Sequence, residues 1–247
     1  MSALVRPLDD EPAPAALMKL TMLAIEIATT AAGEAATALS CGAAERFRSV
    51  RDCEAQLDSL DREVDEHVAE AVAGLSVKEA REVLACSKLV TDLERIGDLV
   101  SSFASRAEAV LKRFEGPDIE DLIRMATGLE AMLKGTTEAL AERDLPAALK
   151  VIRTDSEIDR LRNLIFFRHV EDRDGLARES VHVLLMAQAL ERAGDHAKNL
   201  GEEVCHLLSG HSLRHVKRSH DQPLEQMFLR WLREHDPSKG IPVHPAN

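Results

Sequence analysis

One short motif occurs twice in this chain and constrains its fold more than any other feature. Leu93–Asp98 reads LERIGD and Leu190–Asp195 reads LERAGD, so the two copies lie 97 residues apart in a chain of 247. Similarity at one large, fixed spacing is typical of a duplicated structural unit. We therefore expect two copies of one module, each carrying the same motif.

Each copy of the motif contains two carboxylates four residues apart. These are Glu94 and Asp98 in the first copy and Glu191 and Asp195 in the second. On a helix, this spacing places both side chains on one face, one turn apart. Because two carboxylates on one face repel each other, the repeated pair predicts a cation or a basic partner at both places.

The composition favours helices and disfavours nucleic acid as a partner. Hydrophobic residues make up 45% of the chain and aromatic residues 3%, and there is no Tyr. β-Rich domains depend more on aromatic and β-branched residues, so an all-α fold is predicted. The net charge of −12 argues against binding to a phosphate backbone and favours cations or basic protein surfaces.

The cellular location is predicted from the termini and the cysteines. Residues 1–16 are polar and contain prolines, unlike a signal peptide or a mitochondrial leader, and we expect no segment with the roughly 18 apolar residues that span a bilayer. The four cysteines form no CxxC pair and are expected to be small buried residues in a reducing compartment. A cytoplasmic protein is predicted. The cysteines are Cys41, Cys53, Cys86 and Cys205.

Helix start and stop signals divide the chain into four parts. Residues 1–16 form an N-terminal extension, 17–115 a first three-helix bundle, 118–209 a second, and 210–247 a C-terminal tail. The boundaries rest on Gly74, on a capping box at Ser76–Glu79, and on Gly116–Pro117. The expected helices cover residues 17–47 (interrupted near Gly42), 49–73, 76–114, 119–142, 147–170 and 178–209. The predicted fold is all-α, with two tandem three-helix bundles.

The tail differs in composition from the bundles. Residues 224–234 could form a short amphipathic helix with the chain's only Trp, Trp231, on its apolar face. We favour packing on the chain's own bundle over contact with a second copy or a membrane partner. Three histidines, His211, His215 and His220, could bind metal, although a mobile tail is the interpretation we favour.

Heptad spacing predicts that the carboxylates of neighbouring helices meet in the second bundle. Asp155 and Asp159 flank the apolar seam of helix 147–170, as Glu191 and Asp195 flank the seam of helix 178–209. Counted from the turn near Asp174, Asp155 and Asp159 lie 19 and 15 residues before it. Glu191 and Asp195 lie 17 and 21 residues after it, so the two pairs are level.

The first bundle offers two candidate partners for Glu94 and Asp98. Counted from the turn near Leu75, Glu54 and Asp58 lie 21 and 17 residues before it, which matches the 19 and 23 of Glu94 and Asp98. The pair Asp61/Asp65 also flanks the seam but falls about two turns short. We favour Glu54 and Asp58, and the alternative stays open.

Each bundle is therefore expected to present four carboxylates from two adjacent helices on one edge. Such clusters of hard oxygen donors suit magnesium, manganese, calcium or iron. A solvated acidic edge is the competing interpretation, and the level, duplicated arrangement disfavours it. The predicted metal ligands are Glu54, Asp58, Glu94, Asp98, Asp155, Asp159, Glu191 and Asp195.

The doubled motif resembles that of the PhoU family, regulators of phosphate uptake. Leu93–Asp98 matches the family's "ERIGD" phrase on the third helix, and Leu190–Asp195 differs from it only at Ala193. Asp155–Asp159 resembles the family's "DxxID", and Glu54–Asp58 matches it more loosely. The resemblance covers about residues 17–216, nearly the whole chain.

The resemblance implies a fold, a metal and partners. It implies two three-helix repeats with surface clusters of iron, zinc, manganese or magnesium. It also implies a cytoplasmic adaptor and homodimer, peripheral at the membrane through protein partners, which restrains a phosphate ABC transporter through its ATPase. The same adaptor would keep a sensor histidine kinase inactive when phosphate is plentiful.

Other functions were weighed against this one. Glu179/His182 and Glu203/His206 have the Glu-x-x-His spacing of di-iron enzymes, but the heptad phase points them outward and the first repeat has no counterpart. Neither a phosphate loop nor a nucleophile–base pair is evident, so an enzyme is not expected. A metal-free helical adaptor for another phosphate or sodium-coupled transporter is the main alternative.

Overall fold

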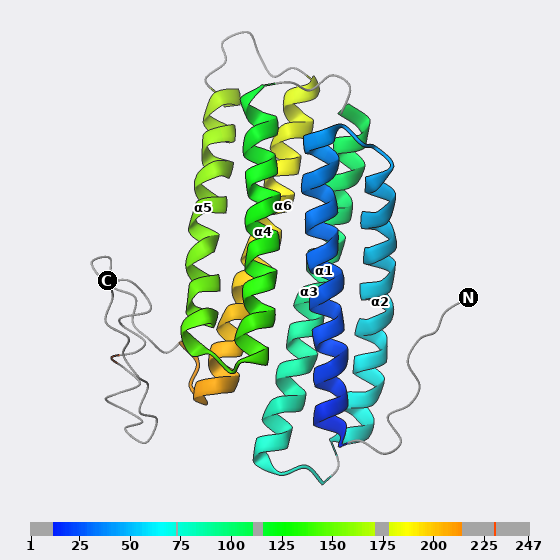
Figure 1. Ribbon diagram of the computed structural model, residues 1–247, viewed down its shortest axis with the longest axis vertical. Helices are drawn as coiled ribbons and strands as arrows, with labels where there is room; N and C mark the ends of the chain where they lie inside the picture. The colour runs from blue at the N-terminus through cyan, green and yellow to red at the C-terminus, as the bar shows by residue number, and fades with distance from the viewer. Residues whose placement is uncertain (1–11, 73, 111–115, 171–177, 214–229, 231–247) are drawn as a thin grey trace.

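The described part of the protein consists of six long α-helices arranged side by side (Figure 1). The computed structural model describes residues 12–72, 74–110, 116–170 and 178–213, together with Arg230. Within these residues the helices are α1 (Ala13–Cys41), α2 (Arg46–Ala71), α3 (Val77–Val110), α4 (Pro117–Ala141), α5 (Leu145–Val170) and α6 (Arg178–Ser209). The predicted all-α fold is confirmed.

The six helices form two three-helix bundles that lie against each other. In Figure 1, α1, α2 and α3 occupy one side of the molecule, and α4, α5 and α6 the other. Each helix contacts the other two of its bundle, and the bundles meet where α3 packs on α6 and α1 packs on α4. The third helix of each bundle therefore has two packed sides, one toward its own bundle and one toward the other.

Local signals explain where the helices begin and end. Gly42 adopts a left-handed conformation with a φ of 67° at the end of α1. The predicted capping box precedes α3, where the Ser76 amide donates to Glu79 and the Glu79 amide donates to the Ser76 hydroxyl. Asp144 accepts a hydrogen bond from the Ala147 amide at the start of α5.

The predicted seam of α3 and α6 is confirmed by burial. All of the described apolar residues at heptad spacing are buried except Leu208 in α6, which is partly exposed. They are Cys86, Val90, Leu93, Gly97, Val100, Ala104 and Ala107 in α3, and Val183, Ala187, Leu190, Gly194, Ala197, Gly201, Val204 and Leu208 in α6. Aromatic residues contribute little to this core except Phe47 and Phe103, which are fully buried. Leucine, alanine and valine at heptad spacing are thus sufficient to pack the bundles.

Several details differ from the sequence expectations. The first helix ends at Cys41, and α2 already begins at Arg46, so residues 46–48 belong to the second helix. Cys41 is exposed, unlike the other three cysteines. The candidate helix at 224–234, with Trp231, and two tail histidines, His215 and His220, lie outside the described residues.

Helix α1 also contradicts the expectation that no segment is apolar enough to span a bilayer. By length and hydropathy it could cross a membrane, and among the described residues it is the only helix that could. A core helix of a soluble protein meets the same criterion, and α1 packs against α2, α3 and α4. This packing buries 44% of its apolar window.

Two mid-helix glycines should respond oppositely to alanine. A Cβ atom at Gly201 would lie 3.1 Å from the backbone carbonyl oxygen of Ala148 and 3.0 Å from Ile152, whereas at Gly128 the nearest atom would be a side-chain carbon of Ile158 at 3.4 Å. We expect Gly128→Ala to stabilise the fold by up to about 1 kcal/mol, a rise of roughly 2–4 °C in Tm. Gly201→Ala should lower Tm because α5 backbone must move.

Thermal unfolding followed by circular dichroism measures both variants against the parent protein. An equal rise in Tm for both would show that α5 and α6 do not approach as closely as described.

Candidate functional site

The predicted carboxylates lie where a glycine of the third helix in each bundle faces the second helix. In the second bundle, a Cβ atom on Gly194 would lie 3.2 Å from Ile158 and 3.3 Å from Oδ1 of Asp155. The missing side chain at Gly194 therefore lets α5 come close enough to bring its carboxylates beside those of α6.

The same approach recurs in the first bundle. A Cβ atom on Gly97 would lie 2.7 Å from the Leu57 side chain and 3.7 Å from Cα of Glu54. Leu57 and Glu54 precede Ile158 and Asp155 by 101 residues, as Gly97 precedes Gly194 by 97. The two bundles thus align residue by residue, and Glu54 is the structural counterpart of Asp155.

In the second bundle, the four predicted carboxylates form one electrostatic group, here called the second cluster: Asp155, Asp159, Glu191 and Asp195. Burial, and then the charge of Asp155, raises the pKa of Asp159 above its usual value, and Asp195 contributes further. Burial, and then the charge of Asp195, raises the pKa of Glu191, with smaller contributions from Asp159 and Asp155. The structure therefore brings all four together, as the residue counts predicted.

Asp155 is the most deeply buried member of the second cluster. It is 1% exposed, and its Oδ2 accepts a hydrogen bond of 2.5 Å from Nζ of Lys198. Burial alone would lower the pKa of Lys198, but the hydrogen bond and charge of Asp155, with Asp195 and Asp159, raise it above its usual value. Lys198 is thus a charged ammonium inside the cluster, which sequence reasoning did not single out.

The other oxygen of Asp155 has no such partner. Oδ1 is buried and accepts no hydrogen bond from any described residue. A buried carboxylate oxygen without a donor is costly, because the water it has lost is not replaced. Lys198 is therefore the described donor that compensates the burial of Asp155.

The first cluster contains Glu54, Asp58, Asp61, Glu94 and Asp98. Burial, and then the charge of Asp98, raises the pKa of Glu94, with further contributions from Asp61 and Asp58. The hydroxyl of Thr91 donates to Asp61 across 3.2 Å, so Asp61 also faces α3.

Each of the two alternative pairs for the first bundle, Glu54/Asp58 and Asp61/Asp65, has one member that acts on Glu94. Asp58 and Asp61 act on Glu94, Glu54 lies beside Gly97, and Asp65 is exposed without an interaction with Glu94. The residue counts favoured Glu54 and Asp58 over Asp61 and Asp65, whereas the structure brings one member of each pair, Asp58 and Asp61, near Glu94.

Arginines balance the first cluster only from the solvent side. Arg62 lies 2.8 Å from Asp58, and Arg95 lies 3.4 Å from Glu94 and 3.9 Å from Asp98. The side chains of both arginines are more than half exposed, and such surface pairs contribute little free energy.

Neither cluster is already arranged around an ion. Among the described residues, no three His, Cys, Asp or Glu side chains are grouped as a metal site. The first cluster nevertheless has suitable chemistry, because its five carboxylates supply only hard oxygen donors and remain partly open to solvent. Binding there would require side-chain rotation that draws the carboxylates of α2 and α3 together.

Polar contacts between the bundles were missed by the sequence analysis. Nδ1 of His196 lies 2.7 Å from Asp92, and Nζ of Lys88 lies 3.2 Å from Glu203. Glu203 and His206 were expected to point away from the core of their own bundle. Glu203 does so, and there it faces α3 of the other bundle. A local sequence signal for these contacts does not exist, because their partners lie more than 100 residues apart.

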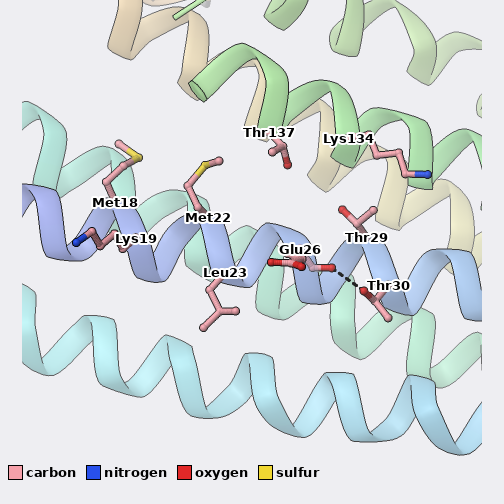
Figure 2. A pocket seen from close by; sticks show the side chains of 9 residues that line it. All are labelled: Met18, Lys19, Met22, Leu23, Glu26, Thr29, Thr30, Lys134 and Thr137. Carbon is pink, nitrogen blue, oxygen red and sulfur yellow. Dashed lines mark hydrogen bonds between the residues drawn. The ribbon is translucent and has the colours of Figure 1, made fainter. Parts of the chain in front are cut away.

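A separate hollow lies between α1 and α4, away from the clusters. It encloses about 600 Å³, with Met18 and Met22 at one end and Lys134 and Thr137 contributed by α4 (Figure 2). Lys134 is paired with Glu130 at 2.6 Å. This lining provides no nucleophile with an adjacent base, so it does not support a catalytic site.

Neutralising one member of the second cluster should stabilise the metal-free protein. A carboxyl whose pKa is raised in the folded state contributes stability at low pH and loses it as the pH rises through that raised value. We expect Asp159→Asn to remove this loss. At pH 7 in chelator, a relief of about 1 kcal/mol would raise Tm by roughly 2–4 °C, and the gain should vanish below pH 4.

Glu157→Gln is the matched control, because Glu157 lies on the same helix but pairs with Arg124 and Arg160. Those arginines lower its pKa, with the hydrogen bond from Arg160 as the main cause. A gain for Glu157→Gln equal to that for Asp159→Asn would contradict repulsion within the cluster.

Comparison with known proteins agrees with this architecture. A family model described as the PhoU domain matches residues 22–107 and 122–204. Two PhoU homologues named phosphate-specific transport system accessory proteins are similar in sequence. The one from Pseudomonas aeruginosa is 30% identical over 68% of this chain and 72% of its own length, and that from Pseudomonas putida is 31% identical over 74% of each.

Two solved structures have the same fold. The crystal structure of PhoU from Pseudomonas aeruginosa superposes with a TM-score of 0.73 at 25% identity, covering 80% of this chain and 97% of that one. The phosphate transport system regulatory protein PhoU from Streptococcus pneumoniae superposes with a TM-score of 0.73 at 19% identity, covering 81% and 96%. Because the family model matches both bundles, this chain belongs to the PhoU family.

Proposed function

We propose that this protein restrains a phosphate ABC transporter, through its ATPase, and keeps a partner sensor histidine kinase inactive when phosphate is plentiful. The family match over both bundles and the names of the relatives support phosphate transport as the process. As a member of this family the chain is a regulatory protein and not an enzyme. It would therefore act by binding, at the cytoplasmic side of the membrane.

The observation that carries the proposal is the pair of carboxylate clusters. Folding brings like charges together and partly removes them from water, which raises the pKa of Glu94, Asp159 and Glu191. Such an arrangement weakens the isolated fold and gains free energy when a positive group approaches. A site with this property is suited to recognition of a cation or of a basic protein surface.

A metal ion is one such positive group, and the donors present suit iron, manganese or magnesium better than zinc. When bound, the ion would supply the positive charge that the clusters lack. The carboxylates of α2 and α3, or of α5 and α6, would hold their two helices in register around it. The proposed ligands are Glu54, Asp58, Glu94, Asp98, Asp155, Asp159, Glu191 and Asp195.

The alternative is a metal-free adaptor for another phosphate or sodium-coupled transporter. Lys198 favours this alternative for the second cluster, because an ammonium group already neutralises part of its charge. In that case, the clusters would act directly on lysines and arginines of a partner. A homodimer stays a prediction under both proposals.

Deleting the gene should raise the expression of phosphate-starvation genes in phosphate-rich medium. A reporter fused to a starvation promoter, together with measured phosphate uptake, tests this. The variant with alanine at four cluster positions should reproduce the deletion without loss of helix content. The four positions are Glu94, Asp98, Glu191 and Asp195.

A matched control removes the same number of charges elsewhere and should complement the deletion fully. Its alanines replace four exposed acids outside the clusters: Asp52, Glu66, Glu70 and Glu120. Binding of the parent protein to the purified transporter ATPase should weaken as salt rises, because exposed charges are screened. Unchanged reporter activity and uptake in the deletion strain would contradict the phosphate assignment.

A further inference from the structure

The first difference between the two clusters is a lysine in one that is replaced by a serine in the other. Ser101 stands 97 residues before Lys198 and therefore occupies the equivalent place on α3. Lys198 reaches Oδ2 of Asp155, whereas serine at position 101 brings no charge to Glu54, the counterpart of Asp155. One bundle thus carries a cation of its own at this level, and the other does not.

A second difference lies at the opposite end of the clusters. Arg162 follows Asp61 by 101 residues and so takes its place on α5. Arg162 acts on Glu191 and Asp159 as a favourable positive charge, whereas Asp61 acts on Glu94 as an unfavourable negative one. The second cluster thus has the sheltered Lys198 in addition to an arginine, whereas the first has, among the described residues, only the exposed Arg62 and Arg95 and an additional carboxylate.

Both side chains of the Lys198–Asp155 pair are sheltered from solvent. The side chain of Lys198 is 26% exposed and that of Asp155 is 2% exposed, so this pair is far more sheltered than the arginine pairs of the first cluster. A metal ion that used Asp155 would have to displace the ammonium from its only described acceptor oxygen. It would also have to share a small space with that positive charge.

We infer that Lys198 is the built-in cation of the second cluster and occupies the position that a metal ion would take, so that only the first bundle binds metal. This inference rests on the proposed cation-binding role of the clusters and narrows the proposed metal ligands to those of the first bundle. It assigns the metal to the bundle of Glu94 and Asp98, and it makes Lys198 the residue that sets cation selectivity in the other bundle.

Oδ1 of Asp155 shows how far the second cluster relies on the single contact with Lys198. It is buried, points toward Gly194, and has no hydrogen-bond donor among the described residues. If Lys198 is made neutral, both oxygens of Asp155 face the cluster without a positive partner. The second cluster should then require an added cation, as the first one does.

The test measures manganese bound to the full-length protein after chelator treatment, reconstitution with Mn²⁺ and gel filtration. The parent should retain manganese, and Glu94→Ala/Asp98→Ala should reduce it to background. Lys198→Gln, which keeps an N–H donor for Asp155, should bind about twice as much manganese as the parent. The added manganese should remain when Lys198→Gln is combined with Glu94→Ala/Asp98→Ala.

The converse exchange tests the same position in the first bundle. Ser101→Lys should weaken manganese binding at least tenfold, because the new ammonium can reach the carboxylates of that bundle. Lys134→Gln is the control, since Lys134 also pairs with a carboxylate, Glu130, but lies outside both clusters. It should bind manganese as the parent does. Circular dichroism confirms that each variant is folded.

A second measurement covers a variant that folds poorly without metal. The Tm of Lys198→Gln should be below that of the parent in chelator and should recover on addition of Mn²⁺, with a larger shift than the parent shows. A variant that is destabilised but does not recover would contradict the inference.

Two further results would overturn the inference and leave metal binding intact. One is a Glu94→Ala/Asp98→Ala variant that still binds half as much manganese as the parent protein. The other is Lys198→Gln with no gain in manganese. Manganese at background in every protein would instead contradict the metal-binding role proposed for the clusters, and this inference with it.

Discussion

The close approach of two acidic helices in each bundle is the constraint on which the rest of the structure depends. Apolar contacts beneath Gly97 and Gly194 pull the helices together, and the carboxylates beside the seam must follow. Burial of Leu57 or Ile158 is favourable by roughly 2 kcal/mol each, enough to outweigh a moderate repulsion at the partly solvated edge. The fold therefore holds charges close together that would separate if the helices were free.

This constraint connects the clusters to the contact between the bundles. Helix α6 carries Glu191 and Asp195 toward α5, and on another side it carries His196 and Glu203 toward α3. Because packed helices move as rigid units, a shift of α6 toward or away from α5 changes its polar contacts with α3. Helix α6 therefore carries two members of the second cluster and also polar contacts with the other bundle.

The sequence predicted the helices well because their signals are local. Capping at Ser76 and Glu79, the glycines at turns and the heptad seam all act within a few residues, and the structure agrees with them. Counting along heptads also placed Asp155 and Asp159 level with Glu191 and Asp195. It could not identify Lys198, because one lysine on a helix surface has no local signal, and its role depends on the burial of a partner 43 residues away.

The two clusters show how a duplicated module can solve one electrostatic problem in two ways. Both copies have the glycine and the apolar contact below it, which allow the helix pair to pack closely, and both also carry acids on either side. The positive charge is not needed for that packing, so its source can differ between copies. In the proposed arrangement, Lys198 supplies it in the second bundle. The open cluster of the first bundle would obtain it from an added cation, and the stability of that bundle would then depend on the cation concentration. The bundle with the lysine would stay folded at any cation concentration, and the other would respond to it.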